Sequence, residues 1–174
     1  AAAYARFTPE IKKLNMPVHL MVGNHDDTAA FGEAFPETPR DDNGFVQSGF
    51  DTLFGRFLLL DTKDPETHAG AYCPARLAWL DRELDQTDGP IVMFMHHPPF
   101  KTGIASMDRI MLQDAEAFHN VMASHKARIR HLFFGHVHRA IFGNWRGISY
   151  SCMRGLNHQV ALELNGAVDR MAAN

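Results

Sequence analysis

Apolar and polar positions alternate along this chain in blocks that predict helices and strands in turn. Phe7, Ile11 and Leu14 recur at helical spacing, whereas the run at 91–95 is almost continuously apolar, as in a buried strand. The predicted strands cover residues 18–22, 45–50, 54–61, 91–95, 131–134, 140–142, 148–152 and 159–164. The predicted helices cover residues 1–15, 28–35, 74–84 and 108–125, and polar loops at 36–44, 62–73 and 98–107 join them.

The order of these elements indicates the fold class. Helices alternate with apolar strands in the first two thirds of the chain, and a strand meander follows. This order predicts an α/β (α+β) fold with two stacked mixed β-sheets, or one mixed sheet, flanked by helices. At 174 residues we expect one domain over residues 1–174 that lacks its N-terminal segment.

Composition narrows the class of protein. The chain is 45% hydrophobic, which suffices for a packed core, and its net charge is −3, which argues against nucleic acid or an anionic membrane as a partner. No apolar stretch approaches the roughly 20 residues that span a bilayer. Cys73 and Cys152 are far apart and predict reduced thiols, which indicates a cytoplasmic protein.

Three polar motifs follow three of the predicted strands directly. They are Gly-Asn-His-Asp at 23–26, His-His-Pro-Pro at 96–99 and Gly-His-Val-His at 135–138. Ligand sites in open α/β sheets lie at the carboxyl ends of strands, so these motifs predict a common site in a cleft.

The side chains of these motifs are suited to divalent metal ions. Asn24 offers a carbonyl oxygen, and His96, His136 and His138 offer imidazole nitrogens, a set that suits Mn, Fe or Zn. If the strand continues through His136 and His138, positions i and i+2 lie on the same face and reach the same metal cluster. If the strand at 91–95 continues through His96 and His97, His97 points to the other side and is a weaker candidate for a ligand.

The remaining histidines carry less information. His68 lies in a polar loop and His158 precedes the last predicted strand, so either could line the cleft. Four others are interpreted as structural or solvated: His19, His119, His125 and His131.

The three motifs resemble the third, fourth and fifth motifs of the calcineurin-like metallophosphoesterases. Within that superfamily, the chain is similar to the class III cyclic nucleotide phosphodiesterases and the bacterial glycerophosphodiesterases, the latter especially at 96–100 and 103–108. The resemblance covers about residues 3–164. It implies a fold of two stacked mixed sheets with helices outside.

The resemblance also implies roles for the site residues. Asn24, His96 and His136 would bind one metal ion, and His138 would bind a second. His25 would bind the substrate phosphate and act as the catalytic group that protonates the leaving oxygen. In the family, a hydroxide held between two ions attacks phosphorus in line. The expected substrate is a small phosphodiester such as a 3′,5′-cyclic nucleotide or a glycerophosphodiester, with His97 as a further substrate contact.

The chain departs from the family pattern in one respect. The family's Asp-x-His and Gly-Asp-x-x-Asp motifs, which supply two Asp ligands and one His ligand, are absent from these 174 residues. Asp26, Asp27 and Asp61 are the nearest carboxylates, and we expect them to cap turns and a strand end instead of replacing those ligands. This polypeptide alone is therefore expected to bind metal weakly and to hydrolyse little.

Other readings stay open at this point. A phosphomonoesterase of the same superfamily would use the same motifs, and a non-catalytic remnant or a metal-storage module would keep part of them. The resemblance makes a homodimer plausible, although no spare apolar stripe marks an interface. The metal identity and the physiological substrate are not decided by the sequence.

Overall fold

A six-stranded mixed sheet forms the centre of the protein, with strand order β1-β2-β3-β4-β6-β5. The structure is a computed structural model and describes residues 2–156, 158–162 and 171–173. The strands are β1 (Ser48–Thr52), β2 (Gly55–Leu59), β3 (Ile91–Met95), β4 (Ile129–Phe134), β5 (Ile141–Trp145), β6 (Ile148–Cys152), β7 (His158–Val160) and β8 (Met171–Ala173). The helices are α1 (Ala2–Ile11), α2 (Thr28–Ala34), α3 (Pro74–Asp85), α4 (Ala105–Arg109) and α5 (Ala115–Ala123).

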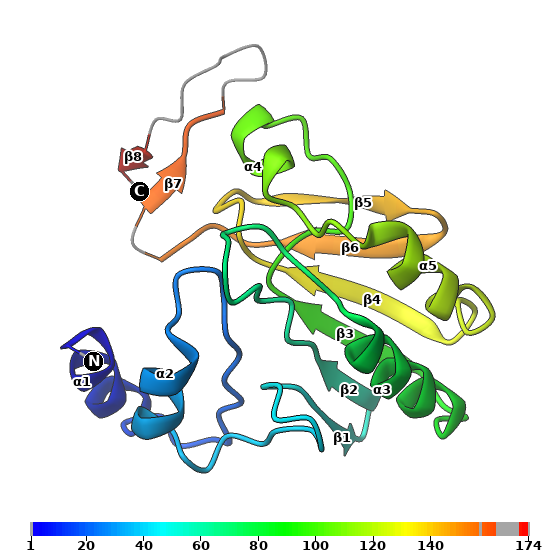
Figure 1. Ribbon diagram of the computed structural model, residues 1–174, viewed down its shortest axis with the longest axis horizontal. Coiled ribbons are helices and arrows are strands. Elements are labelled where there is room, and N and C mark those ends of the chain that lie inside the picture. Colours follow the sequence, from blue (N-terminus) through cyan, green and yellow to red (C-terminus); the bar gives the residue numbers. More distant parts are fainter. Residues whose placement is uncertain (1, 157, 163–170, 174) are drawn as a thin grey trace.

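The four inner strands of this sheet are parallel. β2, β3, β4 and β6 run in the same direction, while β1 and β5 are antiparallel to their neighbours and form the two edges. The carboxyl ends of the four inner strands therefore meet along one edge of the sheet (Figure 1). The residues that follow these strands are brought together there, although they are far apart in the sequence.

Helices α3 and α5 cover one face of the sheet and enclose the main core (Figure 1). Leu80 and Phe118 from these helices pack against Met93 and Leu132 of the central strands, and all four side chains are 0% exposed. Pro74 occupies the first turn of α3, where its missing N–H is not needed. The apolar stripe predicted for this helix is thus the surface that holds it on the sheet.

The opposite face of the sheet carries a row of half-buried aromatic side chains. Phe50, Phe57, Phe94 and Phe133 lie on four adjacent strands, with ring centroids 5.7, 5.4 and 5.0 Å apart along the row. Strands β7 and β8 form a separate two-stranded sheet. The mixed α/β class and the flanking helices predicted from the sequence are confirmed.

The strand predicted at residues 18–22 does not form. No described residue pairs with this segment in a β-ladder, and side chains hold it instead. Val22 packs with Phe31 and Val46 in a small second core, and the ring of His19 stacks on Phe50 at 3.9 Å. An apolar run of this kind becomes a strand only where a neighbouring strand supplies hydrogen bonds.

The helix predicted at 108–125 is two shorter helices, α4 and α5, separated by residues 110–114. The backbone N–H groups of Leu112 and Gln113 donate to the carbonyls of Pro98 and Gly70, so two loops capture the chain there. The last predicted strand is shorter than expected, and its residues 163–164 lie outside the described residues. No helix among the described residues is long and apolar enough to cross a membrane.

Candidate metal and active site

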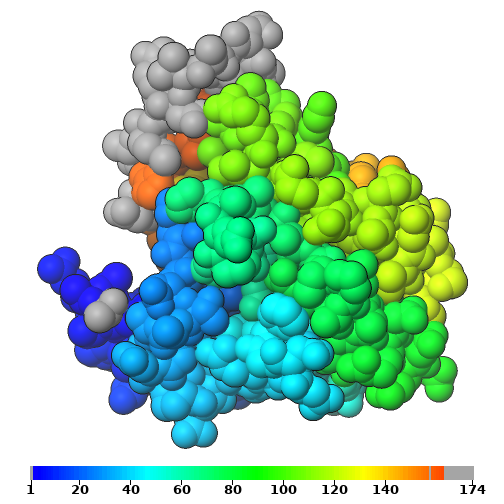
Figure 2. All heavy atoms as spheres, viewed as in Figure 1, coloured from blue at the N-terminus to red at the C-terminus, as the bar shows by residue number. Residues whose placement is uncertain are grey.

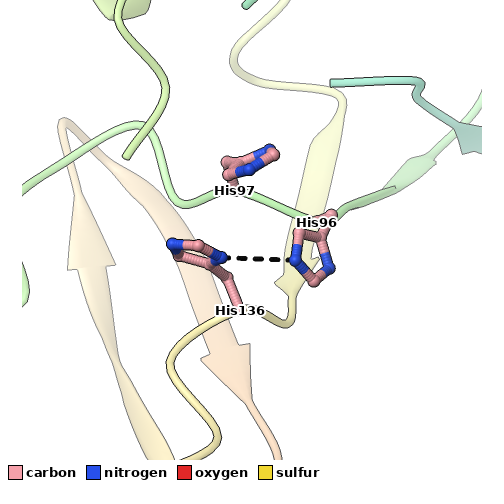
Figure 3. Close-up of side chains that lie close together, drawn as sticks. All are labelled: His96, His97 and His136. Carbon is pink, nitrogen blue, oxygen red and sulfur yellow. Dashed lines mark hydrogen bonds between the residues drawn. The ribbon is translucent and has the colours of Figure 1, made fainter. Parts of the chain in front are cut away.

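The three polar motifs meet at the carboxyl edge of the parallel strands, as predicted. The Asn24 Oδ1 atom lies 2.8 Å from His96 Nε2, and His136 Nδ1 lies 3.3 Å from the same nitrogen. Figure 3 shows His96 after β3 and His136 after β4, with their rings turned toward one another. The segment before α2 thus places Asn24 beside ligands contributed by two strands.

The imidazoles of this cluster are held in the neutral form. Burial, and after it the neighbouring histidines, lower the pKa of His136 to about 3. Burial also places the pKa of His96 well below its ordinary value, with His97 and His136 as the next causes. A metal ion binds the neutral imidazole, so a cluster that resists protonation is suited to hold a cation near neutral pH.

Two buried ring nitrogens in this cluster have no hydrogen-bond partner among the described residues. They are His136 Nε2 and His138 Nδ1. A buried imidazole nitrogen without a partner costs free energy, on the order of 1–3 kcal/mol. A divalent cation beside either atom would satisfy it. The ring of His138 lies 4.5 Å from that of His158. An amide oxygen and neutral imidazole nitrogens form a donor set of the kind that Mn, Fe or Zn accepts.

The backbone of His136 and His138 differs from the prediction. Strand β4 ends at Phe134, and both histidines lie in a bend with positive φ angles of 65° and 50°. The argument from strand positions i and i+2 is therefore wrong here. Non-glycine residues in this conformation are strained by roughly 1–2 kcal/mol each, and such strain is concentrated at functional sites.

His25 is exposed at the mouth of the cluster, next to Asn24. Its ring centroid is 5.0 Å from that of His68. The turn that carries it is fixed from behind, because Asp26 accepts hydrogen bonds from the Tyr4 hydroxyl at 2.5 Å and from the Gly23 N–H at 2.7 Å. His25 is therefore available to a ligand while its backbone is held in place.

The surroundings of His97 differ from those expected for the substrate contact that was predicted. The side chain is 0% exposed, and burial lowers its pKa to about 4. One of its ring nitrogens lies within 4.8 Å of one ring nitrogen each of His96 and His136, a spacing that a metal ion could span. However, Nδ1 contacts Thr62 Oγ1 at 2.9 Å and Nε2 contacts the His68 carbonyl at 3.2 Å. With both nitrogens occupied, His97 is poorly placed to bind substrate or metal.

The three carboxylates near the motifs cap backbone groups, as expected. Asp27 accepts from Ala30 N–H at the start of α2, and Asp26 closes the turn of residues 23–26. Asp61, just beyond β2, accepts from the N–H groups of Val46 and Lys63. These bonds confirm the prediction that the three carboxylates cap turns and a strand end.

Other residues at the site were weakly predicted or missed. His68 and His158 were two weak candidates, and the structure places both beside motif histidines. Thr62 was missed, although it carries the same signal as the motifs, namely a polar residue just after a buried strand. A cavity of about 420 Å³ lies against His136 and His138.

The fold and this histidine cluster are those of a metallophosphoesterase. A family model of calcineurin-like phosphoesterases matches residues 2–140, and the chain belongs to that family. The family binds divalent metal ions, and the cluster described above is where this chain could hold them.

Individual relatives agree with this family. The chain is 42% identical over 166 residues to a probable cyclic nucleotide phosphodiesterase of Rhodopseudomonas palustris, a match that covers 93% of this chain and 60% of the relative. It is 30% identical to a probable glycerophosphodiester phosphodiesterase of Arcobacter nitrofigilis, with 92% and 60% covered. The chain thus spans about 60% of the length of these relatives. A dimetal phosphatase from Danio rerio shares the fold, with a TM-score of 0.71 at 17% identity over 88% of this chain and 67% of that chain.

Proposed function

We propose that the complete gene product is a metal-dependent phosphodiester hydrolase. Its substrate would be a small diester, either a 3′,5′-cyclic nucleotide or a glycerophosphodiester. The relatives named above are described as phosphodiesterases of these two kinds. The observation that carries the proposal is the convergence of Asn24, His96 and His136, together with the two buried ring nitrogens that lack partners.

The proposed roles are those that the family resemblance implies, and the contacts of Asn24, His96 and His136 and the exposure of His25 support them. Asn24, His96 and His136 would hold one cation and His138 a second, with Mn, Fe and Zn as the candidates. Two bound cations would neutralise phosphate charge and lower the pKa of water at the site. The exposed His25 would contact the phosphate and hold a proton at a ring nitrogen for the leaving oxygen, a role worth roughly 10²–10⁴-fold in rate.

The ligand set within these 174 residues is incomplete for two cations. Three neutral donors serve one position and a single imidazole serves the other, whereas the family pattern adds two Asp ligands and one His ligand. The first measurement is therefore the intact mass of the complete gene product. A mass well above 19.6 kDa would provide room for those ligands, and a mass of 19.6 kDa would favour a non-catalytic remnant.

The activity test compares a diester with a monoester. Bis(p-nitrophenyl) phosphate and p-nitrophenyl phosphate are assayed with Mn²⁺, Fe²⁺ and Zn²⁺ in turn. We expect kcat/KM to be at least about tenfold higher for the diester, which corresponds to roughly 1.4 kcal/mol of transition-state preference. A higher kcat/KM for the monoester would support the phosphomonoesterase alternative instead. Cyclic nucleotides and glycerophosphodiesters are then compared directly.

Two substitutions separate catalysis from metal storage. His25→Ala should lose turnover while it keeps its metal content, because His25 is assigned to the phosphate. His136→Ala should lose metal and turnover together. Equal metal loss in both variants would refute the role of His25 and would favour a metal-storage module.

The remaining predictions from the sequence concern context. A single metallophosphoesterase domain, a cytoplasmic location, a homodimer and the lack of nucleic acid or membrane partners remain proposals. Size-exclusion chromatography with light scattering on the complete gene product tests the homodimer directly.

A further inference from the structure

The loop of residues 62–70, which follows β2, brings a second imidazole to Asn24. His68 Nδ1 lies 3.4 Å from Asn24 Nδ2, and the space-filling view shows this loop at the surface beside the segment that contains the 23–26 motif (Figure 2). An amide nitrogen can only donate, so His68 Nδ1 is the acceptor in this contact. The contact determines which end of the amide faces His96, and it leaves the oxygen there, 2.8 Å from His96 Nε2.

The buried ring of His97 ties this loop to the end of β3. Its Nε2 faces the His68 carbonyl, which can only accept, so Nε2 carries the ring proton. Its Nδ1 therefore accepts from the Thr62 hydroxyl, and the same hydroxyl oxygen accepts from the His97 N–H at 3.2 Å. One ring thus joins the first part of the loop, at Thr62, to its far part, at His68.

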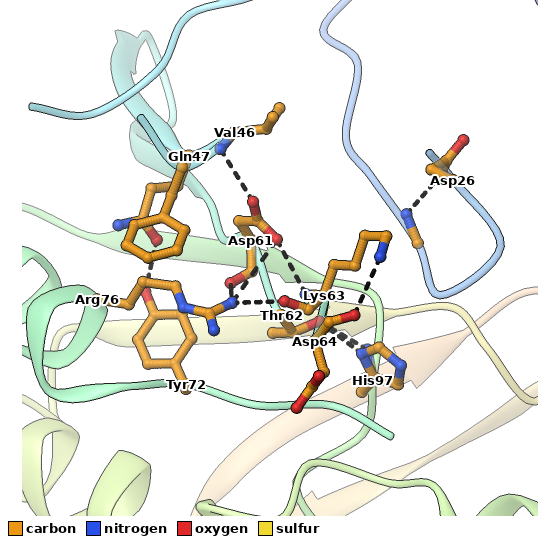
Figure 4. A network of polar contacts seen from close by, with 12 residues as sticks. Asp26, Val46, Gln47, Asp61, Thr62, Lys63, Asp64, Tyr72, Arg76 and His97 are labelled. Atoms are coloured by element: carbon orange, nitrogen blue, oxygen red, sulfur yellow. Dashed lines mark hydrogen bonds and ion pairs between the residues drawn. The ribbon is translucent and has the colours of Figure 1, made fainter. Parts of the chain in front are cut away.

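The surroundings of this ring leave it little freedom. A Cβ atom at Gly70 would lie 2.6 Å from His97 Cγ, so the loop backbone packs directly on the imidazole. Arg76 donates to the carbonyls on both sides of Thr62, those of Asp61 and Lys63 (Figure 4). The buried guanidinium from α3 therefore holds the backbone on both sides of Thr62, and His97 holds the Thr62 hydroxyl.

We propose that His97 is a positioning residue that, together with Thr62, holds the loop so that His68 orients the amide oxygen of Asn24 toward the metal position. The inference rests on the proposed function, because it takes Asn24 as a ligand. It differs from the alternative in which His97 only fills a buried space. In that case, loss of its hydrogen bonds would change stability and leave metal affinity unaltered.

The test removes the hydroxyl on which His97 depends. Thr62→Val, Thr62→Ser and the control Thr87→Val are compared in the complete gene product. Thr87 is a matched control because it is a buried threonine, 7% exposed, whose hydroxyl donates to the Glu83 carbonyl at the far end of α3. The measurements are Mn²⁺ affinity by equilibrium titration and hydrogen exchange of the 62–70 amides in metal-free protein.

We expect Thr62→Val to weaken Mn²⁺ binding by about 10–100-fold, the usual effect of losing a partner that orients a ligand. Hydrogen exchange in the loop should become faster at the same time. Thr62→Ser, which keeps the hydroxyl, should bind like the wild type, and so should Thr87→Val. Unchanged affinity in Thr62→Val would overturn the inference, as would an equal loss in Thr87→Val.

A second pair of variants tests whether the effect passes through His68. His68 is exposed, so His68→Ala should fold even if Thr62→Val does not, and it should weaken Mn²⁺ binding by about tenfold. The double variant Thr62→Val/His68→Ala should bind no more weakly than the weaker single variant, because both changes remove the same constraint. Losses that multiply would overturn the inference.

Failure of the proposed function would give a different experimental result from failure of this inference alone. If Asn24 is not a ligand, Asn24→Ala leaves Mn²⁺ affinity unchanged, and both the proposed function and this inference fail. If Asn24→Ala weakens binding while Thr62→Val and His68→Ala do not, the proposed function stands and only the inference fails.

Discussion

Arg76 is the buried cation that fixes the end of β2, and Arg76→Met tests how much of the fold depends on it. The side chain is 3% exposed, and its Nη1 donates to the carbonyls of Asp61 and Lys63 at 2.8 and 3.0 Å. The same nitrogen lies 3.8 Å from the Asp61 carboxylate, and the guanidinium lies 4.6 Å from the ring centroid of Phe45. Methionine keeps an apolar stem of similar length but provides no donor and no charge.

The size of the effect follows from these contacts. Two buried carbonyls lose their donor, at roughly 1 kcal/mol each. Asp61, 4% exposed, also loses its counter-charge, and removing one partner of a buried pair costs about 3–5 kcal/mol in total. Asp61 keeps two backbone N–H donors, so we expect the low end, about 3 kcal/mol. For a chain of this size the Tm should fall by roughly 6–12 °C.

The loss of folding stability in Arg76→Met should depend on pH in a defined direction. Burial raises the pKa of Asp61, and Arg76 opposes that rise, so Arg76→Met should raise the pKa further. A carboxyl whose folded pKa lies above its unfolded pKa favours the native state at low pH and loses that contribution as pH rises through the folded pKa. The variant's deficit relative to the wild type should therefore be largest near about pH 8 and smaller near about pH 5.

The assay is thermal and urea unfolding of metal-free protein, followed by circular dichroism at both pH values. Arg146→Met is the control, because its ion pair with Glu116 is on the surface, with side chains 42% and 70% exposed. We expect no measurable change in that variant. A loss in Arg76→Met no larger than in the control would refute the reasoning, and so would a deficit that grows as pH falls.

Two further predictions concern the loop and the thiols. Gly70→Ala should cost about 1–3 kcal/mol in urea unfolding, because its Cβ would overlap the buried ring of His97, whereas Gly89→Ala, with nothing within 4 Å, should not. Equal stability of the two variants would contradict this. In the folded protein, a thiol reagent should modify Cys73 before Cys152, because Cys152 is 2% exposed and burial raises its pKa to about 11. Equal reaction rates would contradict that assignment.

The central strands could be predicted from the sequence because they contain short runs of apolar residues. Every position of β3 is apolar, and β4 ends in the apolar run 132–134, because the core lies on one side of these strands and the aromatic row on the other. The segment 18–22 has the same pattern and still forms no strand. Strand formation requires a hydrogen-bonding neighbour, and the apolar pattern of a segment contains no information about one.

The error at residues 108–125 has a similar cause. Apolar residues recur at helical spacing on both sides of the break, so periodicity continues through it. The helix is interrupted because Leu112 and Gln113 donate to carbonyls of two loops that precede them in the chain. These competing hydrogen bonds depend on tertiary contacts, and the spacing of side chains does not reveal them.

The candidate site shows the same division between local and distant information. The proximity of Asn24, His96 and His136 could be predicted because each follows an apolar run, which is a local property of the sequence, although the run before Asn24 forms no strand. Their orientation could not, since His136 and His138 adopt positive φ angles that strand geometry excludes. The role of His97 depends on Thr62, 35 positions earlier in the chain. Reasoning from the motif alone therefore assigns His97 to the substrate and gives Thr62 no role. The hydrogen bonds between Thr62 and His97 lead instead to the prediction that Thr62→Val weakens metal binding, although Thr62 is not itself a proposed ligand.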